Sequence, residues 1–227
     1  MIDYSSEAGD NYHKDRHKEI FGNWTLIEAW GAYAAKEYLR GLDSDDKILE
    51  IGAGTGINIS YVAKSHDVYV VEPSQYARSN CSSMGVKTFD SLENLPKEEK
   101  FDRILLRHVL EHVQSPANFL KDIMPHLRSS GELVVVLPVE SATAQARSDD
   151  IDHHLYCWNP QTISNLVRDV GYEPTEVYIS HHNGRRIFLP IYNIFGIPAY
   201  RYFIKAFGFL TGAKEIIIRC KVTALGA

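Results

Sequence analysis

The stretch ILEIGAGTG, residues 48–56, constrains the fold of this chain more than any other. A short apolar run that includes Glu50 is followed by Gly52, Gly54 and Gly56, which predict a tight turn. Glycine adopts backbone conformations with positive φ and lets the chain pass close to a ligand. When such a turn leads into a helix, its free N–H groups point toward that ligand. The stretch therefore predicts a buried strand, a ligand-contacting turn and a helix, in that order.

Short apolar runs alternate with amphipathic stretches from Lys47 onward. The runs KILEI, DVYVVE, FDRILLR and GELVVVLP are typical of strands, whereas NISYVAKS, SQYARSNCSSM and ANFLKDIMPHLRSS between them are typical of helices. Several of the runs are too uniformly apolar to have one face in water. Strands and helices that alternate in this way form a parallel sheet covered on both faces. We therefore expect an α/β fold with a doubly wound, mostly parallel sheet.

Two acidic residues flank the glycine turn and restrict the kind of ligand. Glu50 precedes the turn, and the next apolar run, VYVVE, ends in Glu72. The spacing G-x-G-x-G differs from the G-x-G-x-x-G fingerprint of NAD-binding folds. A carboxylate beside the turn repels a pyrophosphate and suits a ligand that carries a positive amino group. A carboxylate at the end of the second strand is suited to accept hydrogen bonds from both ribose hydroxyls.

At these residues the sequence resembles the class I S-adenosylmethionine-dependent methyltransferases. The resemblance runs from about Lys47 to Tyr172, with a looser match to a final strand near Glu215. It rests on LEIGAGTG, on VVEPS, and on FDRILLRHVLEHV followed by PHLRSSGELVVVLP. It implies a Rossmann-like methyltransferase fold with a seven-stranded sheet and helices on both faces. It also implies S-adenosyl-L-methionine as the cofactor.

The resemblance also implies where the parts of the cofactor bind. Gly52 and Gly54 are expected to pass close to its methionine part, and Glu72 is expected to hold the ribose. Asp90 and Ser91, in TFDSLENLP after the third strand, are expected near the adenine.

The N-terminal segment NYHKDRH contributes two further candidates. Tyr12 and Arg16 resemble a Tyr/Arg pair that folds over the cofactor in some relatives. The complete set of expected cofactor-binding residues is Glu50, Gly52, Gly54, Gly56, Glu72, Pro73, Asp90, Ser91, Arg107, His108, Tyr12 and Arg16.

The motif RHVLEH, residues 107–112, has two interpretations. His108, Glu111 and His112 match H-x-x-E-H, in which two histidines on one helix bind zinc and a glutamate acts as base. That geometry needs a regular helix, but FDRILLR puts His108 at the carboxyl end of a strand. Open α/β sheets bind their ligands at this end of the strands. We therefore predict no metal site and place the motif at the mouth of a ligand crevice.

Three histidines are candidates for catalysis: His112, His153 and His154. His112 follows the fourth strand on the expected substrate side. The other two lie in DHHLYCW, where related methyltransferases often carry a His-Leu pair before a helix. A neutral histidine can take the proton of an acceptor hydroxyl near pH 7. An amine or an acidic phenol needs no strong base, so the acceptor atom stays open.

An apolar segment, IFLPIYNIFGIPAYRYFIKAFGFL, occupies residues 187–210. Its charged residues are Arg201 and Lys205, and two prolines and two glycines interrupt it. Such interruptions argue against a membrane-spanning helix. Three alternatives remain: a cap on the domain, an interface of a homodimer, or a surface that rests on a membrane or a lipid-linked substrate.

We expect a single methyltransferase domain over residues 1–227. Residues 1–45 form its N-terminal helical lid region in this interpretation, and residues 46–182 form the cofactor-binding core. Residues 183–214 are the apolar insertion or cap, and residues 215–222 are the last strand.

Composition restricts the class of partner and the compartment. The net charge of −5 argues against a protein that neutralises nucleic-acid phosphates. Cys81, Cys157 and Cys220 are scattered and odd in number, which favours a reducing cytoplasm over a disulfide framework. The first residues contain no apolar region of the signal-peptide type. We expect a cytoplasmic protein, with peripheral contact at the inner face of the membrane as the alternative.

The resemblance implies methyl transfer to a small molecule or to a lipid- or nucleotide-linked acceptor. The first expectation is O-methylation of a sugar hydroxyl in a cell-envelope glycan or natural-product pathway. One alternative is methylation of a quinone or another apolar small molecule. An alternative of another class is a scaffold or sensor that binds S-adenosylmethionine without transferring its methyl group.

Overall fold

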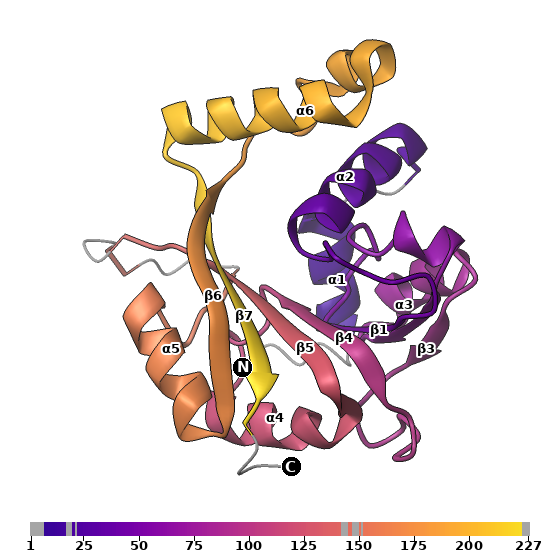
Figure 1. The fold of residues 1–227 in the computed structure, drawn as a ribbon. Helices are drawn as coiled ribbons and strands as arrows, with labels where there is room; N and C mark the ends of the chain where they lie inside the picture. The colour runs from indigo at the N-terminus through magenta and orange to yellow at the C-terminus, as the bar shows by residue number, and fades with distance from the viewer. Residues whose placement is uncertain are drawn as a thin grey trace.

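One mixed sheet organises the molecule (Figure 1). The computed structural model describes residues 7–16, 20, 22–141, 145, 146, 150 and 152–223. The strands are β1 (Lys47–Ile51), β2 (Asp67–Val71), β3 (Lys87–Phe89), β4 (Phe101–Arg107), β5 (Leu127–Pro138), β6 (Tyr172–His181) and β7 (Lys214–Val222). Their order is β3-β2-β1-β4-β5-β7-β6, and β7 runs antiparallel to both of its neighbours. The expected α/β fold with a mostly parallel, seven-stranded sheet is confirmed.

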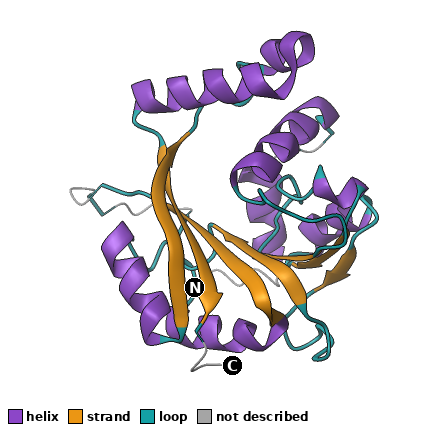
Figure 2. Cartoon of the chain, viewed as in Figure 1, coloured by secondary structure: helices purple, strands orange, loops and turns teal. Residues whose placement is uncertain are grey.

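Helices cover both faces of the sheet (Figure 2). The helices are α1 (Glu7–Arg16), α2 (Trp24–Glu37), α3 (Gln75–Ser82), α4 (Pro116–Ile123), α5 (Pro160–Asp169) and α6 (Leu189–Thr211), with 3₁₀ turns η1 (Val62–Lys64) and η2 (Met124–His126). The sequence carries clear start signals for some of these helices. Asn159 caps α5 by accepting hydrogen bonds from two backbone N–H groups, and Pro160 follows at its first position.

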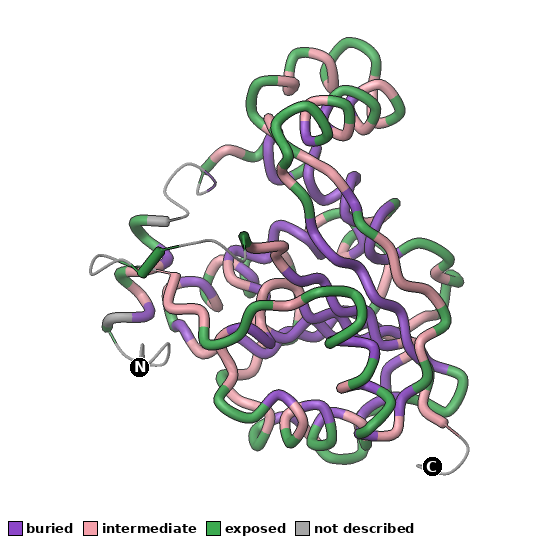
Figure 3. Tube along the Cα trace, turned by 90° about the vertical axis from the view of Figure 1, so that its left-hand side faces the viewer, coloured by how far each residue is buried: buried purple, intermediate pink, exposed green. Residues whose placement is uncertain are grey.

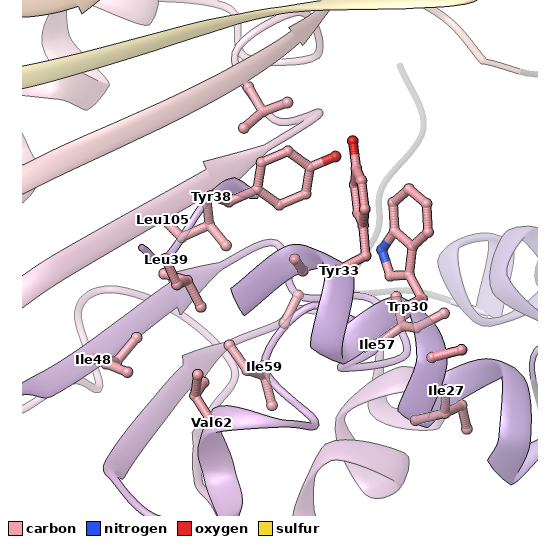
Figure 4. Packing of buried hydrophobic residues seen from close by; sticks show 14 of the residues in the cluster. Ile27, Trp30, Tyr33, Tyr38, Leu39, Ile48, Ile57, Ile59, Val62 and Leu105 are labelled. Atoms are coloured by element: carbon pink, nitrogen blue, oxygen red, sulfur yellow. The ribbon is translucent and has the colours of Figure 1, made fainter. Parts of the chain in front are cut away.

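The uniformly apolar strands divide their side chains between two cores. Ile48 of β1 belongs to the core under α2 and α6, whereas Leu49 belongs to the core under α4 and α5. Val134 and Val135 of β5 divide in the same way. This alternation explains why these strands have no wet face, because each face packs against helices. Figure 4 shows the α2 side of the first core, where Trp30, Tyr33 and Tyr38 lie side by side.

The stretch NISYVAKS is not the α-helix that its pattern predicts. The structure has turns followed by the short η1. The Ser60 hydroxyl donates to the backbone oxygens of Ile27 and Ile57, both at 3.0 Å. Such bonds offer the backbone an alternative to helical pairing. Gly31 of α2 packs directly on this segment: a Cβ there would lie 2.1 Å from Ser60 Oγ.

The apolar segment forms α6, which connects β6 to β7 and lies beside α2 at the outer end of these strands (Figure 1). A break at Gly196, with φ 70° and ψ −168°, divides the helix where the sequence predicts an interruption. Arg201 and Lys205 pair with buried Glu37 of α2, at 3.2 and 2.8 Å. None of the helices within the described residues is long and apolar enough to cross a membrane.

One side of α6 is buried and the other is open. Tyr200 and Ile204 are fully buried against α2, whereas much of the remaining helix is exposed (Figure 3). The large apolar side chains that remain exposed on it are Ile194, Phe195, Tyr202, Phe203, Phe209 and Leu210. An apolar face of this kind on a single chain indicates a contact surface.

Candidate active site

The glycine turn between β1 and η1 has the conformation that its sequence requires. Gly52 and Gly54 have φ values of 70° and 53°, which residues that carry a side chain rarely adopt. A Cβ on Gly52 would lie 2.6 Å from Val109 Cγ2, and one on Gly54 would lie 3.4 Å from His13 Cε1. Gly56 also has positive φ and faces the Cys81 sulfur. The turn therefore leaves bare backbone at the carboxyl end of β1, as a close-binding ligand needs.

Glu50 is a fully buried carboxylate beside this turn. Its Oε1 accepts a 2.7 Å hydrogen bond from Asn58, and Asn58 in turn accepts one of 2.9 Å from Trp30. Its Oε2 has no hydrogen-bond partner among the described residues. Burial raises the pKa of Glu50 to about 8, although the bond from Asn58 and the charge of Arg107 oppose the shift. A ligand that brings a positive amino group would compensate this carboxylate.

Glu72 lies just beyond the end of β2 and is also buried. Its two oxygens accept backbone hydrogen bonds from Gly54, at 2.7 Å, and Ser74, at 2.9 Å. A carboxylate offers about four acceptor positions, so capacity remains for ribose hydroxyls. These bonds also lock the glycine turn to the segment after β2. Pro73, which is half-buried, lies between Glu72 and Ser74 in this segment.

Helix α1 covers the same site, and it adds a residue that the sequence analysis missed. Asp10 accepts hydrogen bonds from the Ser74 hydroxyl, at 2.6 Å, and from the Tyr76 backbone, at 3.0 Å. His13 lies one turn further along α1, with Nε2 3.6 Å from Glu72 Oε1. The spacing of three between Asp10 and His13 was the available signal, because it puts both on one helix face.

The two N-terminal residues singled out from the sequence have different outcomes. Tyr12 is half-buried in α1 and lies edge-on to His13, with ring centroids 5.3 Å apart. Arg16 ends α1, and its side chain lies outside the described residues.

Asp90 and Ser91 directly follow β3, at the carboxyl end of the parallel strands where Glu72 also lies. The Glu72 backbone N–H donates to Phe89 at 2.9 Å, which sets the two strand ends beside each other. Asp90 is exposed and accepts a 2.6 Å hydrogen bond from Asn94. That bond is the main cause of its lowered pKa, so Asp90 stays ionised. Asp90 and Ser91 therefore lie next to Glu72, where the adenine end of the cofactor is expected.

Arg107 and His108, expected at the cofactor, both contact Glu215, a buried carboxylate on β7. Arg107 Nη2 donates to Glu215 Oε1 at 2.5 Å, and His108 Nε2 lies 2.8 Å from the same atom. The Arg107 guanidinium also lies over the rings of Trp30 and Tyr38, at 5.4 and 5.7 Å. The sequence could not reveal this arrangement, because Glu215 lies 108 positions further along the chain.

Glu215 gathers four polar side chains in all. Tyr38 donates to its Oε2 at 2.8 Å, and His182 Nε2 lies 2.7 Å from that oxygen. Burial alone would raise the pKa of Glu215, but the charges of Arg107 and His182 hold it well below its usual range. Burial and the nearby guanidinium lower the pKa of His108. This Glu215 cluster joins α2, β4, β7 and the segment after β6.

A second cluster forms from Glu111, His112 and His154. His112 lies in a turn between β4 and α4, which is closed by the hydrogen bond from its backbone N–H to Val109. Its ring lies edge-on to that of His154, with centroids 4.8 Å apart. Burial lowers the pKa of His112 to about 4 and raises that of Glu111 to about 7. The third histidine, His153, has the uncommon φ of 51°.

His154 is oriented by a carboxylate. Its Nδ1 pairs with Oε1 of Glu140, and Cys157 donates to Oε2 of the same residue at 3.0 Å. Carboxylate pairing at Nδ1 fixes the tautomer and leaves Nε2 to act as acceptor. Glu140 follows β5, so this pair lies at the carboxyl ends of β4 and β5, on the side of the sheet where the glycine turn lies.

The residues at the carboxyl ends of β1 and β2 fit S-adenosylmethionine. Glu50 has an uncompensated buried oxygen for the amino group, Gly52 and Gly54 provide bare backbone, and Glu72 provides ribose acceptors. A pyrophosphate would meet two buried carboxylates there instead. When bound, S-adenosylmethionine supplies a methyl group activated by its positively charged sulfur.

Comparisons with known proteins agree with this geometry. A family profile described as "Methyltransferase domain" matches residues 17–177. Phosphoethanolamine N-methyltransferase 1 of wheat, Triticum aestivum, is 22% identical over 176 residues, which are 69% of this chain and 34% of that protein. The chain thus spans about a third of the length of this relative.

Two solved structures show the same fold. One is the Burkholderia thailandensis 1,6-didemethyltoxoflavin-N1-methyltransferase with bound 1,6-didemethyltoxoflavin and S-adenosylhomocysteine. Its TM-score is 0.61 at 17% identity, over 96% of this chain and 87% of that one. The other is a TehB-like SAM-dependent methyltransferase from Corynebacterium glutamicum, with a TM-score of 0.59 at 16% identity, over 96% and 100%.

The family profile spans more than half of the chain and includes the glycine turn, Glu72 and the His154 segment. The protein therefore belongs to the methyltransferase-domain family, and the residues around its glycine turn fit S-adenosylmethionine as the methyl donor.

Proposed function

We propose that this methyltransferase acts on a hydroxyl, namely a sugar hydroxyl of a lipid- or nucleotide-linked precursor in a cell-envelope glycan or natural-product pathway. The observation that supports a hydroxyl as the acceptor is the pairing of His154 Nδ1 with Glu140. A histidine held in this way is a general base. The sugar class rests on the resemblance of the sequence to enzymes of such pathways.

The chemistry of a hydroxyl acceptor explains the need for such a base. A hydroxyl is a weak nucleophile until its proton leaves, and the proton must go to a nearby acceptor as the new bond to carbon forms. Nε2 of His154 takes that proton, and the Glu140 carboxylate stabilises the resulting imidazolium. His112 stays neutral near pH 7, since its pKa lies near 4, and therefore adds no charge that would oppose this protonation.

An amine acceptor is the second candidate, and the names of the relatives favour it. The wheat protein is named a phosphoethanolamine N-methyltransferase, and the Burkholderia enzyme is named an N1-methyltransferase. A neutral amine attacks without prior deprotonation, so His154 would then be dispensable. The exposed apolar face of α6 supports a further alternative, a quinone or another apolar small molecule.

Transfer of a deuterated methyl group to a panel of acceptors tests the proposal. The panel holds nucleotide sugars, polyprenyl-linked sugars, a quinol and phosphoethanolamine, and products are identified by mass. For a sugar hydroxyl, His154→Gln should lower kcat by roughly 100- to 10,000-fold. His66→Gln is the matched control, because His66 precedes the amino end of β2, whereas the site lies at the carboxyl ends of the strands. A labelled amine product with full activity in His154→Gln would refute the proposal, and binding without any product would favour a scaffold or sensor.

A further inference from the structure

Three side chains with metal-binding chemistry converge beside the cofactor side of the sheet. One ligand atom each from Glu111, His112 and His154 lies within 4.8 Å of the others. Two imidazoles and one carboxylate are a common donor set for zinc, with a fourth position left open. Tetrahedral zinc holds such atoms about 3.3 Å apart, so small side-chain rotations would close the set.

The Glu111 carboxylate is the observation that points to a cation. Glu111 is fully buried, and neither of its carboxylate oxygens has a hydrogen-bond partner in the described part of the chain. Buried carboxylates are normally paired with a charge, bonded to donors or bound to a metal. The neighbouring imidazoles, His112 and His154, offer nitrogen atoms on the same side.

The surroundings hold the three residues in place. The backbone N–H of Leu155 donates to the Glu111 carbonyl at 2.7 Å, which fixes the His154 segment on the turn after β4. Glu140 pairs with Nδ1 of His154, so Nε2 is the atom available to a metal. Zinc-binding histidines characteristically have their other nitrogen paired with a carboxylate in this manner.

We propose that Glu111, His112 and His154 form a zinc site with an open fourth position for water or an acceptor oxygen. This ligand set differs from the H-x-x-E-H pattern of the sequence. His108, the first histidine of that pattern, faces Glu215 instead, and Glu111 is a ligand rather than a base.

Zinc at this position would change the role of His154. Its Nε2 would be a ligand and no longer the base. The metal would lower the pKa of a bound acceptor hydroxyl, as it does for zinc-bound water, and the proton would pass to solvent water. This consequence rests on the proposed hydroxyl acceptor, whereas zinc binding itself does not.

Metal content and affinity test the site without any methyl transfer. The full chain is stripped with a chelator, titrated with ZnSO₄ against a chromophoric zinc indicator, and analysed by mass spectrometry for bound metal. We expect one zinc per chain, and at least a tenfold loss of affinity in Glu111→Gln, His112→Gln and His154→Gln. His108→Gln and His66→Gln should keep the affinity of the wild type. Circular dichroism confirms that each variant is folded.

The possible outcomes distinguish the zinc site from the proposed function. Substoichiometric zinc, or wild-type affinity in folded Glu111→Gln and His154→Gln, overturns the site. Loss of affinity in His108→Gln overturns the ligand set in favour of the sequence pattern. Because the titration involves no acceptor, zinc binding together with an amine product would keep the site and refute the proposed function. A sugar product formed at full rate by the zinc-free enzyme would keep the proposed function and overturn the catalytic role of the zinc.

Discussion

Single carboxylates determine what the cofactor side of this molecule can bind. Glu72 lies at 3% exposure, bonded to the backbone of the glycine turn and of the segment after β2. Glu50 is completely buried and keeps one oxygen without a partner among the described residues. Loss of the negative charge at either residue should therefore change a measurable quantity: cofactor affinity for Glu72 and the free energy of unfolding for Glu50.

Removal of the Glu72 carboxylate should weaken cofactor binding. We expect Glu72→Ala to raise the Kd for S-adenosylhomocysteine by an amount worth about 1–3 kcal/mol, because the ribose hydroxyls lose their acceptor in a closed site. Isothermal titration calorimetry measures this. Glu28→Ala, which removes an exposed partner of Lys64, should leave the Kd unchanged. The same calorimeter should detect no binding of NAD, and NAD binding in place of S-adenosylhomocysteine would contradict the cofactor assignment.

Glu50 should make the ligand-free protein less stable as the pH rises. Its pKa is about 8 in the folded chain against 4.5 as the ordinary value, so between these values the folded state holds the extra proton. The stability contributed by Glu50 is therefore present below about pH 4.5 and is lost as the pH rises toward 8. Glu50→Gln removes this titration, so its free energy of unfolding should exceed that of the wild type increasingly from pH 5 to pH 8. Urea titrations at four pH values measure the difference, and a constant difference would show that Glu50 is ionised throughout.

At the scale of elements, α6 is the least ordinary part of the fold. Arg201 and Lys205, the charged residues of this apolar segment, pair with Glu37 and hold α6 on α2. Phe207, also in this segment, is half-buried against Phe188. The exposed face is therefore carried by other side chains, chiefly Tyr202 and the residues near Phe209.

A double variant and a single variant on α6 should differ in their effect on stability. The double variant Tyr202→Ser and Phe209→Ser should change the free energy of unfolding by less than about 0.5 kcal/mol, because both side chains are about 70% exposed. It should lower the retention of the protein on anionic liposomes if the face rests on a membrane. Ile204→Ala, at a fully buried position of the same helix, should cost about 2–5 kcal/mol.

Size-exclusion chromatography with light scattering separates the remaining alternatives for α6. A homodimer of the wild type that dissociates in the double variant identifies this face as an interface between two chains. Retention on liposomes that the double variant does not lower would contradict the membrane contact.

At the scale of the whole molecule, Glu215 connects parts that are far apart in the chain. It contacts Tyr38 after α2, Arg107 and His108 at the end of β4, and His182 after β6. The insertion of β7 between β5 and β6 brings these segments together. The cluster therefore connects the segment between β6 and α6 to the carboxyl end of β4, beside the candidate site.

Glu215→Ala should destabilise the whole fold. The substitution leaves a buried guanidinium and two histidines without their carboxylate, and breaking a buried ion pair in this way costs about 3–5 kcal/mol. Urea unfolding followed by circular dichroism measures the loss. Glu173→Ala on β6 removes an exposed partner of Arg168 and should cost less than about 0.5 kcal/mol. Equal costs for the two variants would show that the Glu215 cluster contributes nothing beyond a surface pair.

The sequence alone determined the parts of the protein that depend on neighbouring residues. The run from β1 through the glycine turn needs only local chemistry: apolar residues for the strand, and positive φ for Gly52 and Gly54. The alternation of strands and helices then determined the fold class, because an apolar strand must be covered on both faces. The role expected of Glu72 has the same local origin, since it follows from its place at the end of β2.

The tertiary structure alone decided which distant side chains meet. His154 reaches Glu111 and His112 because a segment after β5 folds back over the turn after β4, and Arg107 reaches Glu215 because β7 is inserted beside β5. His13 reaches Glu72 because Asp10 docks α1 on the segment after β2. None of these contacts leaves a periodic trace in the sequence, because each joins residues brought together by strand order and loop path rather than by spacing along one element.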